Sequence, residues 1–228
     1  MGGIKLIFSN NKNRGIESFC SMMAFLLLLI AVKMSAQWLN SLDLMIQNAT
    51  TISPNSILAQ IFKTLTFFGS PAVALLFSAI LAAFFFYKRE WVTSLWITFT
   101  ILGGDAIAFI VKEVVRRPRP LGIIGGDTGF SFPSGHVFGT TILIFFVIYI
   151  IGPRIKSYEN RILLTSIMWL WLIIILISRI CLRSHYPSDV LGSILLAISW
   201  WKFAQVLYVK YYSLAKSTIE HLTLKRVN

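Results

Sequence analysis

Three short polar stretches interrupt a strongly apolar sequence, and their residue types suit chemistry on a phosphoryl group. They span residues 112–120, 131–136 and 179–189. Together they hold several cations, two of the three histidines in the chain and the carboxylate of Asp189. Arginine presents a planar fork of N–H donors that matches phosphate oxygens, and lysine supplies a compact point charge.

The second stretch predicts a turn that can bind an anion. Pro133 and Gly135 stop a helix on either side of Ser134, so the serine hydroxyl and nearby backbone N–H groups can face a ligand. Small residues also let backbone N–H groups approach an anion closely. His136 follows at once and opens the next apolar run.

Two histidines can divide the work of phosphoryl transfer. One can attack phosphorus while the other handles the proton of the leaving group. A carboxylate beside a nucleophilic histidine fixes its tautomer and stabilises the cationic ring. Asp189 is a candidate for this role on His185, four residues before it.

Six apolar runs are long enough to position these stretches at a membrane surface. A bilayer span needs about 20 mostly apolar residues. Of the 228 residues, 56% are hydrophobic and 13% are charged, against about a quarter charged in a soluble domain. The sequence therefore predicts an all-α polytopic membrane protein, a single domain over residues 1–228, with six spans near residues 18–39, 69–87, 91–111, 137–151, 162–182 and 190–211.

The net charge of +12 would suggest a nucleic-acid partner in a soluble protein, but the placement of the charge argues against one. With both termini in the cytoplasm, inner segments hold 13 of the 21 Lys and Arg residues and outer segments hold seven. This positive-inside bias predicts a cytoplasmic tail over residues 1–17 and an outer segment over residues 40–68. All three polar stretches then meet at the outer face. Within the outer segment, residues 57–68 show helical apolar spacing and predict a short amphipathic helix, which could gate lipid access or simply pack on the bundle.

Asp105 falls inside the third span, where a carboxylate is costly. It precedes Lys112 by seven residues, so two helical turns place both residues on one face. Asp105 could support the cationic site from below, or it could serve in a structural hydrogen bond or salt bridge.

Other cations near the ends of the spans have less specific interpretations. Lys and Arg at helix ends commonly act as interfacial anchors, and this is our interpretation of Lys33, Lys63 and Arg116. Arg117 and Arg183 fit either an anchor or a contact with substrate.

In order and spacing, the polar stretches resemble the three motifs of the type 2 phosphatidic acid phosphatase superfamily. The matching motifs are Lys112-(six residues)-Arg119-Pro120, Pro133-Ser134-Gly135-His136 and Ser178-Arg179-(five residues)-His185-(three residues)-Asp189. The resemblance covers about residues 100–195, and the six spans are similar to the integral-membrane branch of the family. The short chain looks most like bacterial lipid phosphatases that act on undecaprenyl diphosphate or phosphatidylglycerophosphate.

This resemblance implies a role for each motif residue. It implies that His185 is the nucleophile, that His136 protonates the leaving oxygen and that Asp189 supports His185. It also implies that no metal or other cofactor takes part, and the sequence offers no carboxylate cluster or His-x-x-x-His pair that would suggest a metal. The residues implied to hold the phosphate are Lys112, Arg119, Ser134, Gly135 and Arg179.

We therefore expect a plasma-membrane lipid phosphatase whose partners are a lipid phosphate substrate and the surrounding membrane lipid, with no nucleic acid. One alternative is a phosphotransferase that passes the phosphoryl group to a second lipid. Another is a non-catalytic lipid transporter, although binding alone needs no acid, base and nucleophile such as His136, His185 and Asp189. The generic apolar surface of the spans specifies neither the lipid headgroup nor the oligomeric state.

Overall fold

The described part of the chain is helical throughout its regular structure. The computed structural model describes residues 7–8, 11 and 13–224, with side chains to residue 219, so most of the predicted tail over residues 1–17 lies outside it. Six helical stretches are long and apolar enough to cross a bilayer. The predictions of an all-α fold and of six spans are thus confirmed. The helices are α1 (Asn13–Lys33), α2 (Gln37–Ala49), α3 (Ile57–Phe68), α4 (Pro71–Tyr87), α5 (Trp91–Val115), α6 (Gly135–Phe146), α7 (Tyr158–Cys181) and α8 (Pro187–Leu224).

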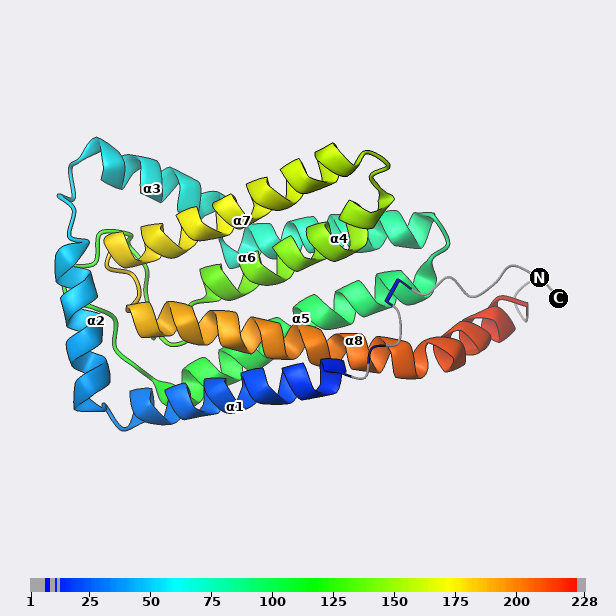
Figure 1. The fold of residues 1–228 in the computed structure, drawn as a ribbon, viewed down its shortest axis with the longest axis horizontal. Helices are drawn as coiled ribbons and strands as arrows, with labels where there is room; N and C mark the ends of the chain where they lie inside the picture. Colours follow the sequence, from blue (N-terminus) through cyan, green and yellow to red (C-terminus); the bar gives the residue numbers. More distant parts are fainter. Residues whose placement is uncertain (1–6, 9–10, 12, 225–228) are drawn as a thin grey trace.

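The long helices run roughly along one axis, and α2 crosses one end of the bundle (Figure 1). The α5–α6 loop and the α7–α8 turn lie at the end that α2 covers. The α4–α5 and α6–α7 turns lie at the opposite end, together with the start of α1. All three polar stretches are therefore gathered at the end of the bundle that carries α2.

Several helices begin where the sequence supplies a serine cap. The side chains of Ser56, Ser70, Ser134 and Ser157 each accept a hydrogen bond from the backbone N–H three residues on. Such a cap satisfies one of the N–H groups that a helix start leaves without a partner. Pro71, at the first position of α4, costs no hydrogen bond there.

The first span begins and ends earlier than predicted, since α1 runs from Asn13 to Lys33 rather than from about residue 18 to 39. Ser35 takes a left-handed conformation, with φ of 53°, and turns the chain into α2. Lys33 donates to the carbonyl oxygen of Val114 at 2.8 Å, near the end of α5. The last carbonyl groups of a helix have no partner within it, and a lysine can bind them favourably. Lys33 therefore connects the end of α1 to the end of α5.

Helix α8 is joined to α5 by aromatic side chains that also make polar contacts. The indole N–H of Trp96 donates to the Ala204 carbonyl at 2.8 Å, and that of Trp200 donates to the Thr100 carbonyl at 2.7 Å. In a membrane the lipid is as apolar as the helix surfaces, so the hydrophobic effect does not drive helices together. Close packing and interhelical hydrogen bonds hold them together instead. These contacts hold the middle of α8, the helix that carries Asp189, against α5, the helix that carries Lys112.

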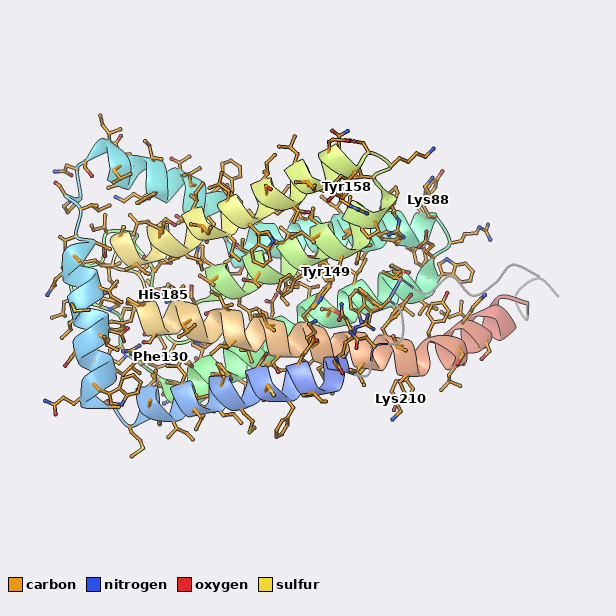
Figure 2. All side chains as sticks on the ribbon, viewed as in Figure 1. Lys88, Phe130, Tyr149, Tyr158, His185 and Lys210 are labelled. Carbon is orange, nitrogen blue, oxygen red and sulfur yellow. The ribbon has the colours of Figure 1, made fainter. Side chains whose placement is uncertain are left out.

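Figure 2 shows how the labelled side chains divide along the bundle. His185 and Phe130 lie toward the end covered by α2, whereas Lys88 and Lys210 lie toward the other end. Large apolar side chains are exposed along the outer faces of the long helices, as on Leu76, Phe109 and Leu163. In a bilayer these faces would meet lipid chains.

Candidate active site

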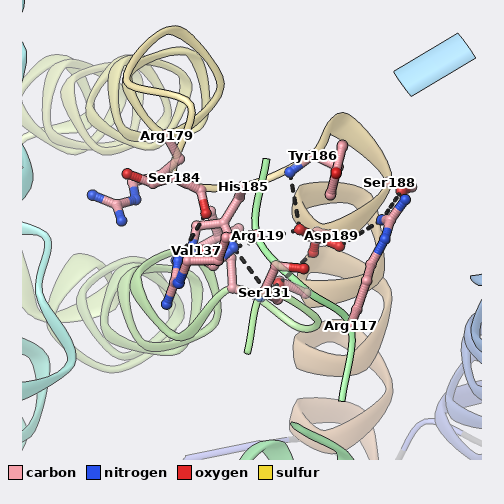
Figure 3. A network of polar contacts seen from close by, with 12 residues as sticks. Arg117, Arg119, Ser131, Val137, Arg179, Ser184, His185, Tyr186, Ser188 and Asp189 are labelled. Atoms are coloured by element: carbon pink, nitrogen blue, oxygen red, sulfur yellow. Dashed lines mark hydrogen bonds and ion pairs between the residues drawn. The ribbon is translucent and has the colours of Figure 1, made fainter. Parts of the chain in front are cut away.

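Five segments meet at the end of the bundle that α2 covers. They are the last turns of α5, the loop over residues 116–134, the start of α6, the end of α7 and the turn into α8. Figure 3 shows His185 between a group around Asp189 and Arg117 on one side and Arg179 with Ser184 on the other. The three polar stretches of the sequence therefore form one site.

The loop over residues 116–134 is shaped by residues with positive φ. Arg116 ends α5 with φ of 53°, and Gly122, Gly126 and Gly129 have φ of 76°, 75° and 73°. Glycine reaches this region without the steric cost of a Cβ. The loop is then tied down where Ile124 donates to the Leu182 carbonyl at 2.9 Å.

His185 is buried, and one of its ring nitrogens is already engaged. Nδ1 lies 2.8 Å from the carbonyl oxygen of Ser131. A carbonyl oxygen only accepts hydrogen bonds, so Nδ1 carries the proton and Nε2 keeps its lone pair in the neutral ring. Nε2 lies 3.2 Å from Nη1 of Arg119. A guanidinium nitrogen only donates, so Nε2 accepts a hydrogen bond from Arg119, and its lone pair points toward the cationic part of the site.

Asp189 shares with Ser131 the role that was predicted for Asp189 alone. Its Oδ2 lies 3.6 Å from Nδ1 of His185, which is an electrostatic contact rather than a good hydrogen bond. The same oxygen accepts from the backbone N–H of Tyr186 at 2.9 Å. The Ser131 carbonyl therefore sets the tautomer of His185, while Asp189 supplies a nearby negative charge.

The surroundings of His185 favour its neutral form. Burial is the main cause that lowers its pKa, to about 4, and the charges of Arg179 and Arg119 lower it further. Asp189 opposes this shift without cancelling it. At neutral pH the ring is uncharged, which is the form that can attack phosphorus.

Arg119 is held in place by backbone carbonyl groups. Nε and Nη2 donate to Thr128 at 3.2 and 2.9 Å, and Nη1 donates to Ser184 at 2.7 Å. Burial lowers the pKa of Arg119, while Asp127 and Asp189 partly counter the shift. Its guanidinium is thereby fixed beside Nε2 of His185.

The ammonium group of Lys112, by contrast, makes no hydrogen bond or ion pair with any described residue, whereas the backbone carbonyl of Lys112 accepts from the N–H of Arg116. Lys112 interacts electrostatically with Arg119, Asp189, Asp127 and Arg179. The ammonium group is therefore within the field of the site and has donors to offer a ligand.

Arg179 is paired with a carboxylate that the sequence did not single out. Its Nη2 donates to Oδ2 of Asp127 at 2.6 Å, and Ser184 donates to the same oxygen at 2.6 Å. Burial would raise the pKa of Asp127, but Arg179 and Ser184 outweigh it and lower the pKa to about 2. Nε of Arg179 is buried and has no hydrogen-bond partner among the described residues.

Ser134 and Gly135 form the start of α6 rather than an open turn. The Ser134 hydroxyl caps the helix by accepting from Val137 at 3.5 Å, and its own backbone N–H donates to Ser193 at 2.7 Å. Ser193 thus occupies the backbone N–H of Ser134 itself, and the prediction that the serine hydroxyl and nearby N–H groups face a ligand stays a prediction. The first N–H groups within the helix still favour an anion there.

His136, in the first turn of α6, lies within electrostatic reach of Asp127 and His185. Its ring is partly buried. The two motif histidines are thus brought to one place by helices that are distant in the sequence.

Arg117 is neither a surface anchor nor a free cation. Nη1 donates to Oδ1 of Asp189 at 2.7 Å and to Ser188 at 2.7 Å, while Nη2 donates to Oδ2 of Asp43 at 2.7 Å. Burial alone would lower its pKa, but Asp189 and Asp43 raise it overall. The guanidinium also lies 4.0 Å from the ring centre of Tyr186.

Asp105 and Arg183 are two further residues for which the sequence allowed more than one role. Among the described residues, none forms a hydrogen bond or ion pair with the Asp105 carboxylate, and Asp105 is not one of the charged neighbours of Lys112. Asp105 and Lys112 are therefore not in contact, although they lie two turns apart on the same helix. Arg183 takes a left-handed conformation after α7, and no described residue forms a hydrogen bond with its buried Nε.

Comparison with known proteins identifies the family. The model of the PAP2 superfamily matches residues 93–212, which include all three motifs. The chain belongs to the PAP2 superfamily. This confirms the resemblance drawn from the motifs.

Two relatives and one solved structure extend the PAP2 match. Phosphatidylglycerophosphatase B of Bacillus subtilis is 26% identical over 178 residues, covering 76% of this chain and 86% of that protein. Phosphatidylglycerophosphatase B of Haemophilus influenzae is 42% identical over 74 residues, covering 31% of this chain and 30% of that protein. The crystal structure of a transmembrane PAP2-type phosphatidylglycerolphosphate phosphatase from Bacillus subtilis superposes with a TM-score of 0.72 at 23% identity. It covers 85% of this chain and 96% of that one, so the fold is shared.

Sequence reasoning missed Asp43 and Asp127, both of which hold arginines of the site. Asp127 lies between Gly126 and Gly129 in a polar loop, and nothing in its spacing marks it. Asp43 carries a weak signal, because Asp43 and Gln47 are four residues apart and share one face of a helix whose neighbours are apolar. Polar side chains along one face of an otherwise apolar helix predict that this face contacts polar groups of the protein rather than solvent.

Proposed function

We propose that this PAP2 protein removes a phosphate from a membrane lipid phosphate or diphosphate through a phosphohistidine at His185. Its family and its two phosphatidylglycerophosphatase B relatives make it a phosphatase, and its six apolar helices make it a multi-pass membrane protein. One observation carries the mechanism. Nδ1 of His185 donates to the Ser131 carbonyl at 2.8 Å, which leaves Nε2 as the unprotonated ring nitrogen, 3.2 Å from Nη1 of Arg119.

In the first step, Nε2 of His185 attacks phosphorus and the bond from phosphorus to the lipid oxygen breaks. His136 gives its proton to the departing oxygen, because a lipid alkoxide is a poor leaving group. Negative charge on the phosphoryl oxygens is stabilised by the fixed cations of the site, Lys112, Arg119 and Arg179. Asp189 stabilises the positive charge that develops on the His185 ring.

In the second step, water attacks the phosphohistidine. His136, now neutral, accepts a proton from that water, and the bond from phosphorus to Nε2 breaks. Inorganic phosphate leaves, and His185 returns to its neutral form with the proton still on Nδ1. The same residue thus serves first as acid and then as base.

Phosphatidylglycerophosphate is the first substrate to test, because both named relatives are phosphatidylglycerophosphatases B. Undecaprenyl diphosphate is the second, as a lipid diphosphate on a longer apolar tail. The exposed apolar faces of the long helices accommodate either tail, so the headgroup decides between them.

The test is phosphate release by the purified protein from both lipids and from phosphatidic acid, in detergent with EDTA present. We expect release from at least one lipid, inhibition by vanadate, and no release by a His185→Gln variant. Vanadate can mimic the five-coordinate transition state in a cation-lined site. Absence of release from every lipid would overturn the proposal. Transfer of labelled phosphate to a second lipid instead of water would support a phosphotransferase.

A further inference from the structure

Helix α2 has its polar side chains buried and its apolar side chains exposed. Asp43 and Gln47 are each 2% exposed, whereas Trp38 is 60% and Met45 is 61% exposed. An ordinary surface helix shows the reverse arrangement. A buried carboxylate is costly unless charged or polar partners satisfy it, so the partners of Asp43 explain why the helix is built this way.

Asp43 holds the first turn of α8. Its Oδ1 accepts from the backbone N–H of Ser188 at 2.9 Å, and its Oδ2 accepts from the Ser188 hydroxyl at 2.6 Å. One turn along α2, the Gln47 side chain donates to the backbone carbonyl of His185 at 3.2 Å. The helix therefore fixes both ends of the segment between His185 and Asp189.

A second route joins Asp43 to the nucleophile through charge. Its Oδ2 also accepts from Nη2 of Arg117 at 2.7 Å, and Nη1 of Arg117 donates to Oδ1 of Asp189 at 2.7 Å. The other oxygen of Asp189 lies 3.6 Å from the His185 ring. Charges thus alternate along Asp43, Arg117 and Asp189, ending at a ring that becomes positive when Nε2 binds phosphorus.

Arg117 lies in the middle of this series of contacts and needs both carboxylates, Asp43 and Asp189. A single guanidinium beside Asp189 would offset the negative charge that should stabilise the cationic His185 ring. Asp43 compensates by binding the other half of the guanidinium. It also leaves Arg117 a single geometry, because both of its Nη atoms are engaged.

We propose that Asp43 is a positioning residue for phosphoryl transfer. Through Arg117 and Ser188 it sets the orientation of His185 and the charge that Asp189 presents to the ring. Asp43 touches the His185 ring nowhere, and its effect passes through the residues between. This inference rests on the proposed function, since it assigns a role within that reaction.

The main test is Asp43→Asn, which removes the charge and keeps nearly the same shape. Displacement of a reacting group by about 1 Å can cost about 10²-fold in rate, and we expect a fall of this order in kcat with KM nearly unchanged. The fall should be similar for phosphatidylglycerophosphate and p-nitrophenyl phosphate, since both need His185 to attack. Asn48→Ala, at an exposed position on the same helix, is the matched control and should match wild type.

A double-variant cycle separates positioning from general loss of structure. Because Asp43 acts through Arg117, Arg117→Gln should lower kcat by a comparable factor, and adding Asp43→Asn to it should change kcat little further. Losses that multiply in the double variant would overturn the inference. So would a rise in KM at unchanged kcat, or an Asp43→Asn enzyme equal to Asn48→Ala.

Ser188→Ala keeps the inference testable if Asp43→Asn does not fold. It removes one donor to Asp43 and one acceptor of Arg117 and leaves every charge in place, so we expect a folded protein with a smaller fall in kcat. An unchanged kcat would contradict the positioning role. Failure of the proposed function would look different, because wild type itself would then release no phosphate from any lipid.

Discussion

At the scale of single residues, the two motif histidines should fail in different ways. His185→Ala leaves no atom to accept phosphorus, so no covalent intermediate can form on any substrate. His136→Ala removes the proton donor, so its loss should grow with the basicity of the leaving group. A lipid alkoxide departs badly without a proton, whereas p-nitrophenolate hardly needs one.

The measurement is kcat/KM for each variant on phosphatidylglycerophosphate and on p-nitrophenyl phosphate, with acid quenching to trap labelled phosphohistidine. We expect His136→Ala to keep a larger share of wild-type activity on p-nitrophenyl phosphate. Asp189→Asn should fall between the two histidine variants, because it removes no reacting atom. Labelled intermediate in His185→Ala would reassign the nucleophile, and equal losses on both substrates would leave His136 as a phosphate ligand.

The low pKa of His185 also predicts how stability depends on pH. The ring has a pKa of about 4 in the folded protein and about 6.5 when unfolded. Between these values the unfolded chain binds more protons, so this residue makes the protein less stable as pH falls from 6.5 toward 4. His185→Gln cannot titrate and should escape that loss.

We therefore expect the Tm of His185→Gln, relative to wild type, to rise as the pH is lowered from 7 to 4.5. The assay is thermal unfolding of both purified proteins in the same detergent. Parallel Tm curves would mean that folding leaves the pKa of His185 unshifted. A relative fall in the Tm of the variant would mean that folding raises this pKa, which conflicts with a neutral nucleophile.

At the scale of helices and loops, Phe132 fixes the loop that leads into His136. Its ring is buried and stacks on Phe25 of α1, with centroids 5.9 Å apart and planes 17° apart. The ring also lies against Gly192 of α8, where a Cβ would come within 2.6 Å of it. Only glycine lets α8 approach the ring this closely.

Gly192→Ala should therefore push Phe132 and the following residues out of place. We expect a lower Tm and a lower kcat/KM than in wild type, since over-packing a filled site is destabilising. The control is Gly15→Ala in α1, where a Cβ would meet nothing within 4 Å. Wild-type values for Gly192→Ala would show that the ring has room to move and does not hold the loop.

Apolar runs in the sequence predict some helix boundaries correctly and miss others. Residues 57–68 were predicted as a short helix and form α3, packed along α7. The end of α1 was missed, because the left-handed turn at Ser35 lies inside a run that stays apolar through Leu39. An apolar run indicates that its residues are buried or contact lipid, but it does not indicate where the backbone turns.

For the whole molecule, the fold and the meeting of the motifs could be predicted because both depend on simple counts. Span lengths follow from bilayer thickness, and alternate crossings bring the three polar stretches to one end. The partners of Arg117 and Arg179 could not be predicted. Asp43 lies 74 residues from Arg117, and Asp127 lies 52 residues from Arg179. Such pairings depend on how α2 and the loop over residues 116–134 fold across the site.

Orientation in the membrane is a further property of the whole molecule, and it is predicted from charge alone. The end opposite the site carries the turns with Lys88, Arg89, Arg154, Lys156 and Arg161. Basic residues near the ends of spans remain in the cytoplasm. We therefore predict a cytoplasmic face at that end and an active site that faces outward.

Single cysteines on a background without Cys20 and Cys181 test this orientation. Leu121, 91% exposed in the loop over residues 116–134, marks the site end, and the exposed Lys156 marks the opposite end. A membrane-impermeant thiol reagent should label Leu121→Cys on intact cells, and Lys156→Cys only after the membrane is opened. Neither position lies in a hydrogen bond or ion pair of the site, so both variants should keep phosphatase activity and report on the native fold. Labelling of Lys156→Cys alone on intact cells would place the active site in the cytoplasm. The cations near the site, which include Lys112, Arg117 and Arg119, would then add to the inner charge, and the basic turns would have to be explained as outer-surface features.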